Sequence, residues 1–467
     1  MNQAANSPNQ NPLATEPVGK LILKFSVPSI ISMIVNALYN MIDQIFIGQG
    51  IGMLGNAATN VAFPLTTIST AIALLVGIGS ASNFNLRLGA GRKKQAARFM
   101  ASGLSLSILF GTVLAVIVAI FMEPLLYAFG ATEAVMPYAH PYTSIITLGI
   151  PFLVFSTAAS NLIRAAGSPK YAMACIISGA IFNIIFDPIF MFGLDMGIEG
   201  IAWATTLGQV LSTGIAVAYF IRLKAIRFKR KYFLPHKAFT SKIMALGSAS
   251  CFNQLAITVV QIALNNTLTY YGGMSAYGSE APLAAAGVIT KINMIFLSFA
   301  IGVAQGCQPI NGFNYGAKNY ARVRETIKKA TIAVLVIGCI AFACFQLFPR
   351  QITLIFGEGS DEYFTFAERF LRIFMMMTFV NGIQPVAANF FTSIGKARKG
   401  IFISLTRQII FLLPLVLILP VFMGVEGIVY AGPIADGVSA MLAILFIYRE
   451  TKELRALEEG RLAAPLS

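Results

Sequence analysis

Charged residues are scarce in this sequence. Lysine, arginine, aspartate and glutamate make up 11% of the 467 residues, whereas 57% are hydrophobic and the mean hydropathy is +0.74. A soluble globular protein has roughly 25% charged residues, so this chain has too little polar surface for a water-soluble fold. The composition predicts an integral membrane protein, and membrane lipids are therefore its first expected partners.

Residue types that build metal and cofactor sites are also rare. The two histidines, His140 and His236, are too few for a haem, zinc or di-iron site. The five cysteines lie in apolar segments and show neither metal-ligand nor disulfide spacing. The phosphate-binding motif G-x-x-x-x-G-K-[ST], the H-E-x-x-H motif and a nucleophile elbow are all missing, which disfavours an ATP-driven pump and a membrane-embedded enzyme. We expect no cofactor and no catalytic residues.

Long apolar segments dominate the chain. A membrane-spanning helix needs about 20 apolar residues, and twelve segments of this kind lie between breaks made by glycine, proline or charge. The sequence thus predicts an all-α polytopic protein. Residues 1–19 lack the apolar core of a signal peptide, so the first helix should insert uncleaved. The expected helices lie near residues 21–48, 57–84, 99–122, 139–163, 171–193, 198–221, 243–271, 282–311, 330–348, 363–393, 400–422 and 425–448.

The net charge of +15 is distributed unevenly among the loops. Lysine and arginine gather after the second, fourth, sixth, eighth and tenth spans, and the intervening loops are mainly acidic. Basic loops remain in the cytoplasm, so the alternation supports twelve spans and predicts a multi-pass protein of the cell inner membrane with both termini cytoplasmic. Since the positive charge is spread over five loops, it does not indicate nucleic-acid binding.

The two halves of the chain resemble each other at a constant offset. The segment Gly197-Ile198-Glu199-Gly200-Ile201 recurs as Gly424-Val425-Glu426-Gly427-Ile428, and Leu88-Gly89-Ala90 recurs as Tyr315-Gly316-Ala317, both at an offset of 227. Each repeat holds six spans, an even number, so the repeats have the same orientation in the membrane. We expect a polar N-terminus (1–19), an N-terminal lobe (20–221), a basic linker (222–242), a C-terminal lobe (243–448) and a cytoplasmic tail (449–467).

Ionisable residues inside a membrane span are candidates for function, because a charge at the bilayer centre costs about 3 kcal/mol or more. Asp43, Asn183, Asp187 and Thr205 are expected at similar depths in the first, fifth and sixth helices. Two carboxylates, an amide and a hydroxyl suit a hard cation such as Na⁺. They equally suit a proton site, because two neighbouring carboxylates in a low dielectric do not both ionise cheaply. A structural role, hydrogen bonding to backbone opened by Pro188, is the third interpretation.

The whole chain resembles the multidrug and toxic compound extrusion (MATE) family, in its MepA/DinF-like bacterial branch. The resemblance implies a cation-coupled antiporter that exports small lipophilic, often cationic compounds in exchange for H⁺ or Na⁺, with the cation site in the N-terminal lobe at the four positions named above. It rests on the twelve spans, the repeat and a set of motifs: Pro28, Asn40-x-x-Asp43, Gly89-Ala90-Gly91, Arg164-Ala165-Ala166-Gly167, Asn183-x-x-x-Asp187-Pro188 and Gly197-x-x-Gly200-x-x-x-Ala204-Thr205.

Three further residues have open interpretations. Asn40 is a candidate for the substrate-binding surface, and Lys291 and Asp436 lie deep in the eighth and twelfth helices. The latter two either pair with each other or each face the space between the lobes. Arg407 is expected to extend from the eleventh helix toward the cytoplasmic surface.

The leading functional hypothesis is thus a secondary transporter in which two lobes alternately expose a central site, and the chain is expected to act as a monomer. The alternative is a flippase for lipid-linked precursors, whose relatives share the two-lobe plan. Such proteins usually line the space between the lobes with arginines, and this chain has a single arginine well inside a span.

Overall fold

The computed structural model describes residues 11–223, 229–275, 280–355 and 361–461, and these are helical almost throughout. Eleven helices are long and apolar enough to span a membrane, and a bent pair, Tyr363–Phe374 with Thr378–Ser393, completes a twelfth span. The prediction of an all-α protein with twelve spans is confirmed.

The N-terminal lobe consists of the helices up to α8. Their bounds are α1 (Pro12–Thr15), α2 (Val18–Gly50), α3 (Met53–Gly89), α4 (Lys93–Ile120), α5 (Met122–Ala128), α6 (Met136–Ala165), α7 (Pro169–Pro188), the π-helix η3 (Ile189–Gly193) and α8 (Gly197–Arg222). The short 3₁₀-helix η4 (Arg230–Tyr232) follows this lobe.

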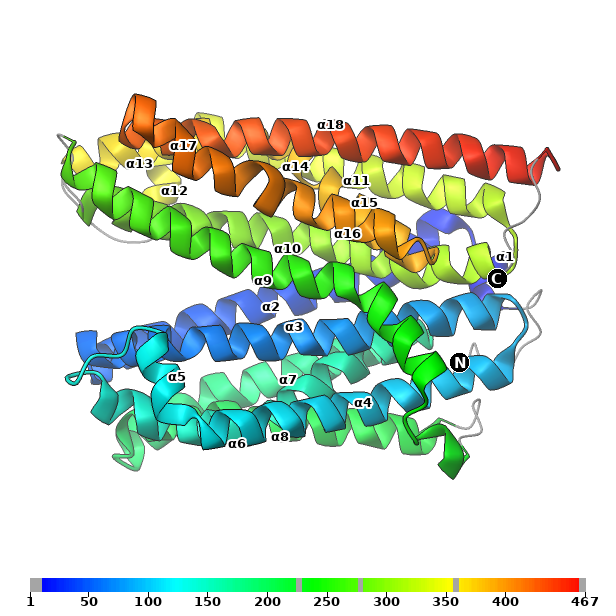
Figure 1. Ribbon diagram of the computed structural model, residues 1–467, viewed down its shortest axis with the longest axis horizontal. Coiled ribbons are helices and arrows are strands. Elements are labelled where there is room, and N and C mark those ends of the chain that lie inside the picture. The colour runs from blue at the N-terminus through cyan, green and yellow to red at the C-terminus, as the bar shows by residue number, and fades with distance from the viewer. Residues whose placement is uncertain (1–10, 224–228, 276–279, 356–360, 462–467) are drawn as a thin grey trace.

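The C-terminal lobe comprises the helices from α9 onward. Their bounds are α9 (Lys237–Gly273), α10 (Glu280–Gly316), α11 (Tyr320–Leu347), α12 (Pro349–Leu354), α13 (Asp361–Phe374), α14 (Thr378–Asn381), α15 (Ile383–Ser393), α16 (Ala397–Leu405), the π-helix η5 (Thr406–Leu412), α17 (Leu413–Met423) and α18 (Val425–Glu458). In Figure 1 the two lobes lie one above the other, with both ends of the described chain at the same end of the bundle. We call this the terminal end and the opposite one the distal end.

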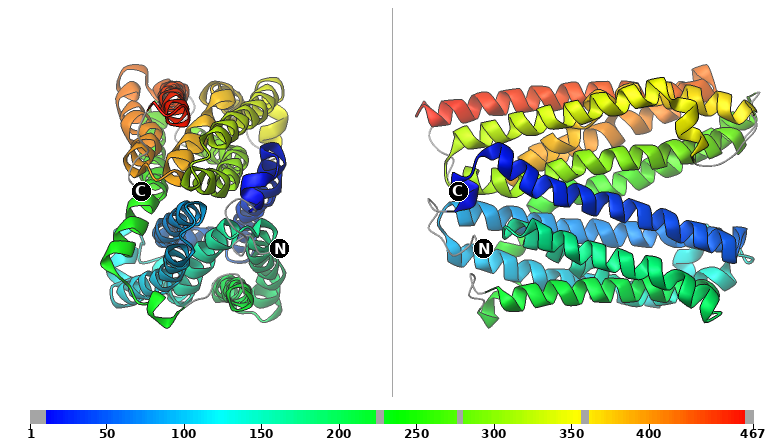
Figure 2. Two further views of the ribbon diagram at one scale, coloured as in Figure 1. Left: turned by 90° about the vertical axis from the view of Figure 1, so that its right-hand side faces the viewer. Right: turned by 180° about the vertical axis from the view of Figure 1, so that it is seen from behind.

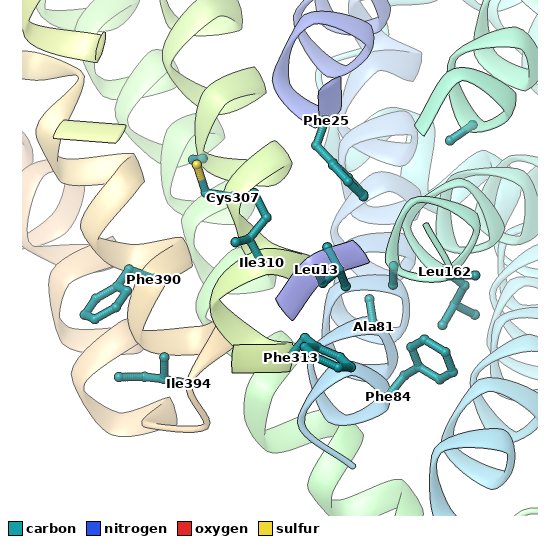
Figure 3. Packing of buried hydrophobic residues seen from close by; sticks show 14 of the residues in the cluster. Leu13, Phe25, Ala81, Phe84, Leu162, Cys307, Ile310, Phe313, Phe390 and Ile394 are labelled. Carbon is teal, nitrogen blue, oxygen red and sulfur yellow. The ribbon is translucent and has the colours of Figure 1, made fainter. Parts of the chain in front are cut away.

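The hydrophobic core shows where the lobes meet. At the terminal end one cluster combines residues of both lobes, among them Leu13, Phe84, Ile310 and Phe390, as Figure 3 shows. Toward the distal end each lobe has a core of its own, one around Leu65 and Val154 and the other around Phe370 and Ile428. The ribbons accordingly diverge from the terminal end, in front and rear views alike (Figures 1 and 2). The lobes are thus packed together at one end only.

Glycines make this packing close enough to exclude a side chain. A Cβ atom on Gly79 of α3 would lie 2.0 Å from the carbonyl oxygen of Ile243 in α9, and one on Gly306 of α10 would lie 2.4 Å from Ser26 Oγ in α2. Small residues allow helix backbones to approach in this way, which maximises van der Waals contact where lipid gives no hydrophobic driving force. The Gly79 and Gly306 positions are the ones related by the internal repeat.

The outer segments are more helical than the hydropathy pattern indicated. The helix α9 begins at Lys237, inside the stretch expected as linker, and α18 continues to Glu458. In this extension the buried Glu450 forms ion pairs with Lys396 at 2.5 Å and Lys399 at 2.7 Å. Burial alone would lower the pKa of Lys396, but its hydrogen bonds to Glu450 and Glu453 outweigh this and raise the pKa above the usual value. These ion pairs secure the end of α18 to the start of α16.

Candidate functional site

The centre of the candidate site is an amide–carboxylate pair on α7. Asn183 and Asp187 are four residues apart, so they project from the same face of the helix, and both are buried, with 2% and 0% of their surfaces exposed. Asn183 Nδ2 donates hydrogen bonds to Asp187 Oδ1 at 3.1 Å and to Thr205 Oγ1 of α8 at 3.0 Å. One amide therefore links three of the four residues expected to act together.

The fourth residue, Asp43, comes from α2. Its carboxyl group lies near the Asp187 carboxyl group, and two neighbouring carboxyl groups do not both ionise cheaply unless a proton or a cation neutralises them. Tyr39 of α2 and Tyr142 of α6 lie beside both carboxyl groups. Four helices thus contribute polar groups to one location within the N-terminal lobe.

Several oxygen atoms in this cluster lack a donor. Asp43 Oδ1, Asp187 Oδ2 and Asn183 Oδ1 are buried and receive no hydrogen bond in the described part of the chain. Buried oxygens of this kind are costly unless a donor or a cation satisfies them. A proton held between the carboxyl groups would give their oxygens a donor, and a Na⁺ ion prefers oxygen ligands of the carboxylate and amide type. The donor set therefore suits either coupling ion.

Asn40 has a different position. Its side chain is exposed and donates to the backbone carbonyl oxygen of Asn36, one turn earlier in α2, at 2.7 Å. Asn40 is therefore only three residues before Asp43 in the sequence, but its amide forms its hydrogen bond within α2.

A second charged group is buried in the C-terminal lobe. Asp436 of α18 is 1% exposed, and its Oδ1 accepts a hydrogen bond from Arg407 Nε at 2.5 Å. Its other oxygen accepts from Asn381 Nδ2 of α14 at 3.2 Å. Arg407 belongs to the π-helix η5, and Asn381 belongs to the short helix after the break in the bent span Tyr363–Ser393. The ion pair thus lies where two helices of this lobe are irregular.

These contacts correct two expectations. Asp436 forms its ion pair with Arg407, so of the two interpretations left open for Lys291 and Asp436 the mutual pair is wrong; Lys291 is exposed and has no ion pair with any described residue. The expectation that Arg407 extends to the surface is wrong as well, because the residue is 5% exposed. A buried carboxylate attracts the nearest guanidinium, and this attraction outweighs the tendency of a long side chain to reach water.

Two features of the site could hardly be predicted from the sequence: the role of Tyr142 and the pairing of Arg407 with Asp436. Tyr142 lies between Pro141 and Thr143 in an apolar span, and only its approach to the carboxyl groups of α2 and α7 distinguishes it from an ordinary core residue. Arg407 and Asp436 are 29 positions apart in the sequence and lie on different helices. The sequence shows only that opposite charges occur inside spans of the same lobe. It does not show whether Asp436 pairs with Arg407 or with Lys291.

Comparison with known proteins places the fold in context. The MatE family model matches residues 28–189 and 249–418, one block in each lobe and together well over half of the chain. Among solved structures, a multidrug resistance MATE family transporter in its outward-facing conformation superimposes with a TM-score of 0.86 at 23% identity, covering 97% of this chain and 98% of the other. A transporter of the MOP superfamily from Pyrococcus furiosus, described as having a binding pocket of reverse polarity, gives 0.87 at 23% identity with the same coverage.

Curated relatives are similarly distant in sequence and similarly complete in length. The multidrug export protein MepA of Staphylococcus haemolyticus is 23% identical over 92% of this chain and 93% of its own. The FAD transporter of Shewanella oneidensis is 24% identical over 91% of this chain and 93% of its own. Because the family model matches most of both lobes, this chain is a multi-pass membrane transporter that belongs to the MATE family.

Proposed function

We propose that this chain is a cation-coupled antiporter that exports small lipophilic organic compounds from the cell in exchange for H⁺ or Na⁺. The observation that carries the proposal is the cluster of Asp43, Asn183, Asp187 and Thr205, which unites two carboxyl groups and three donor-free buried oxygens. The family and relatives such as MepA, a multidrug export protein, support the substrate class.

Coupling follows from the chemistry of the carboxyl pair. With one proton or one Na⁺ bound, the negative charges of Asp43 and Asp187 are partly neutralised and α2 is held against α7. Without it, two buried carboxylates repel each other, and the free energy falls when α2 moves or solvent enters. Cation binding therefore favours one arrangement of α2 over another, which is the differential affinity that coupling requires.

The lobes provide the second half of the mechanism. They share a core at the terminal end and have separate cores toward the distal end. The basic loops favour a cytoplasmic terminal end in the inner membrane, in which case this arrangement faces outward. Pro28 interrupts the backbone hydrogen bonds of α2 between the shared core and Asp43, which lowers the cost of bending there. Each chain contains both lobes, so a monomer suffices.

The alternative function, a flippase for lipid-linked precursors, would need basic groups between the lobes to hold a pyrophosphate. Arg407 would be the natural choice, but it is buried in the C-terminal lobe and bound to Asp436. The antiporter is therefore favoured. Complementation of a strain deficient in envelope-precursor translocation tests the flippase, and resistance to toxic compounds on expression tests the antiporter.

The deciding experiment is dye transport into everted membrane vesicles under an imposed Na⁺ gradient or an imposed pH gradient. Transport that follows one gradient and is collapsed by the matching ionophore identifies the coupling ion. Transport that follows ATP and ignores both gradients would contradict the proposal.

A further inference from the structure

The surfaces that the lobes turn toward each other carry very little charge in their distal halves. Four helices make most of the contact at the lobe boundary: α2 and α3 from the N-terminal lobe, and α9 and α10 from the C-terminal lobe. Over residues 30–50, 53–75, 247–275 and 281–298 of these helices the charged residues are Asp43 and Lys291. Any fixed charge that these four segments present to a substrate must come from one of these two side chains.

Asp43 points away from the boundary. Ile30 of α2 contacts the other lobe, since a Cβ on Gly302 would lie 2.5 Å from its side chain. Asp43 is about 3.6 turns further along, which is roughly the opposite side of the helix. Its contact with Asp187 agrees with this, because α7 belongs to the same lobe. The carboxylate cluster is therefore turned into the N-terminal lobe.

Lys291 points toward the boundary. It precedes Gly302 by about three full turns of α10, so both lie on the same side of the helix. The Gly302 end of that side packs against Ile30, whereas Lys291, in the distal half, is exposed. The side of α10 turned away from Lys291, with Ile289 and Phe296, is buried in its own lobe. A mid-membrane lysine facing lipid is costly, and such residues face a polar or hydrated surface instead.

The neighbouring helix α9 supplies that polar surface. Gly247 packs on α3, with a Cβ there only 1.7 Å from the Leu75 carbonyl oxygen. Gln254, Gln261 and Asn265 follow at about two, four and five turns, so they continue the same side of α9. Gln261 Nε2 donates to Asn265 Oδ1 at 2.9 Å. The exposed apolar residues Phe252, Val259 and Tyr270 lie on another side.

We propose that this surface, Lys291 with Gln254, Gln261 and Asn265, binds an acidic group of the transported compound, such as a carboxylate, sulfonate or phosphate. The ammonium group supplies the charge, and the amides supply directional hydrogen bonds. The inference rests on the proposed transport function and names its substrate class: amphiphilic anions and zwitterions are bound in preference to purely cationic compounds. A lone positive charge repels lipophilic cations as strongly as it attracts anions of the same shape.

The test uses two dyes with one ring system, of which one has a free acidic group and the other has that group esterified. Rhodamine B carries a free carboxylate, and its ethyl ester is a cation with the same ring system. Binding of each dye to the purified protein in nanodiscs is measured by fluorescence anisotropy. We expect the wild type to bind rhodamine B about tenfold more tightly than the ester, a typical effect of one hydrogen-bonded charge pair.

The variants locate this preference. Lys291→Met should bring the two affinities to within about twofold, and Lys291→Arg should retain the preference. Lys452→Met removes the same charge from an exposed position at the far end of α18 and should leave the preference unchanged. A wild type that binds neither dye or prefers the ester would overturn the proposal, as would a Lys291→Met variant that keeps the preference for rhodamine B.

Transport separates this inference from the function on which it rests. If binding shows the expected preference but neither a Na⁺ nor a pH gradient drives rhodamine B into everted vesicles, the antiport function fails and the binding site stands. If a gradient drives the ester alone, the antiport function stands and the anion site fails.

Discussion

At the scale of single residues, the carboxyl group of Asp43 gives the most direct prediction. Asp43→Asn keeps the size of the side chain and removes its charge, so we expect a folded, inserted protein without gradient-driven efflux. The matched control is Asp195→Asn: this aspartate is exposed and has a φ of 55°, a conformation that asparagine also tolerates. Efflux in vesicles, normalised to the inserted protein, checks both variants. Undiminished efflux by Asp43→Asn would remove this residue from the coupling site.

The Arg407–Asp436 pair gives a prediction about stability. Arg407→Met leaves a buried carboxylate without its partner and should lower the free energy of unfolding by about 3–5 kcal/mol. Adding Asp436→Leu removes the orphaned charge and should restore part of the loss. Thermal unfolding in detergent measures both effects. A double variant as unstable as the sum of the two single variants would show that the residues do not act as a pair.

An exposed ion pair provides the comparison. Lys329 and Glu325 form an i,i+4 pair on α11 with more than 40% of each side chain exposed. Because solvent screens such pairs, Lys329→Met should change the stability by less than about 0.5 kcal/mol. The contrast with Arg407→Met isolates the effect of burial.

At the scale of helices, the sequence predicts where each helix lies better than where its regular hydrogen-bond pattern is interrupted. The twelve spans follow from hydropathy and the alternating loops, and the cluster of Asp43, Asn183, Asp187 and Thr205 follows from their depth. The interruptions were harder to predict. Pro188 and Pro414 each lie at the edge of a π-helical segment, where a missing backbone donor widens a turn. Proline signals that a break occurs, but the contacts of neighbouring helices determine its form.

The tenth span, which is the bent one, shows why some features cannot be predicted from the sequence. Residues 363–393 were expected as one helix, and the structure bends the pair Tyr363–Phe374 and Thr378–Ser393 by 46°. The break covers Met375, Met376 and Met377, which are good helix formers. Here the tertiary contacts of Asn381 with Asp436 and of Gln384 with the backbone of Ile403 favour the bend. Such contacts join distant segments, and no local pattern reveals them.

Helix packing between the lobes gives a third prediction. Gly79→Ala places a methyl group 2.0 Å from a carbonyl oxygen of α9, so α3 and α9 must separate. This contact belongs to the arrangement with the terminal end closed, and we expect the variant to shift the population away from it and to reduce transport. Gly214→Ala in α8 is the matched control, since nothing lies within 4 Å of the added atom. Equal transport by the two variants would mean that the contact does not limit the cycle.

At the scale of the whole molecule, the repeat is symmetric in architecture and asymmetric in charge. Both lobes have six spans and share the glycine positions of the repeat, such as Gly79 and Gly306, yet the N-terminal lobe holds a carboxyl pair with donor-free oxygens and the C-terminal lobe holds a neutralised ion pair. The positive charge of Arg407 occupies the place that a free cation would take beside Asp436. The proposed coupling cation is therefore assigned to the N-terminal lobe alone.

The final prediction concerns the relative motion of the two lobes. If the lobes rock about the boundary, opening at one end must accompany closing at the other. Spin labels at Gln49 and Met274 occupy exposed distal positions in opposite lobes, and they should approach each other when the distal end closes. Labels at Lys94 and Lys318, near the terminal end, should separate in the same transition. Cys339 and Cys344 are exposed and must be replaced before labelling. Pulsed electron paramagnetic resonance with and without the coupling cation measures both distances. Anticorrelated changes are the signature of rocking lobes, whereas a change at the distal pair alone would assign the motion to α2 bending at Pro28 within a fixed pair of lobes.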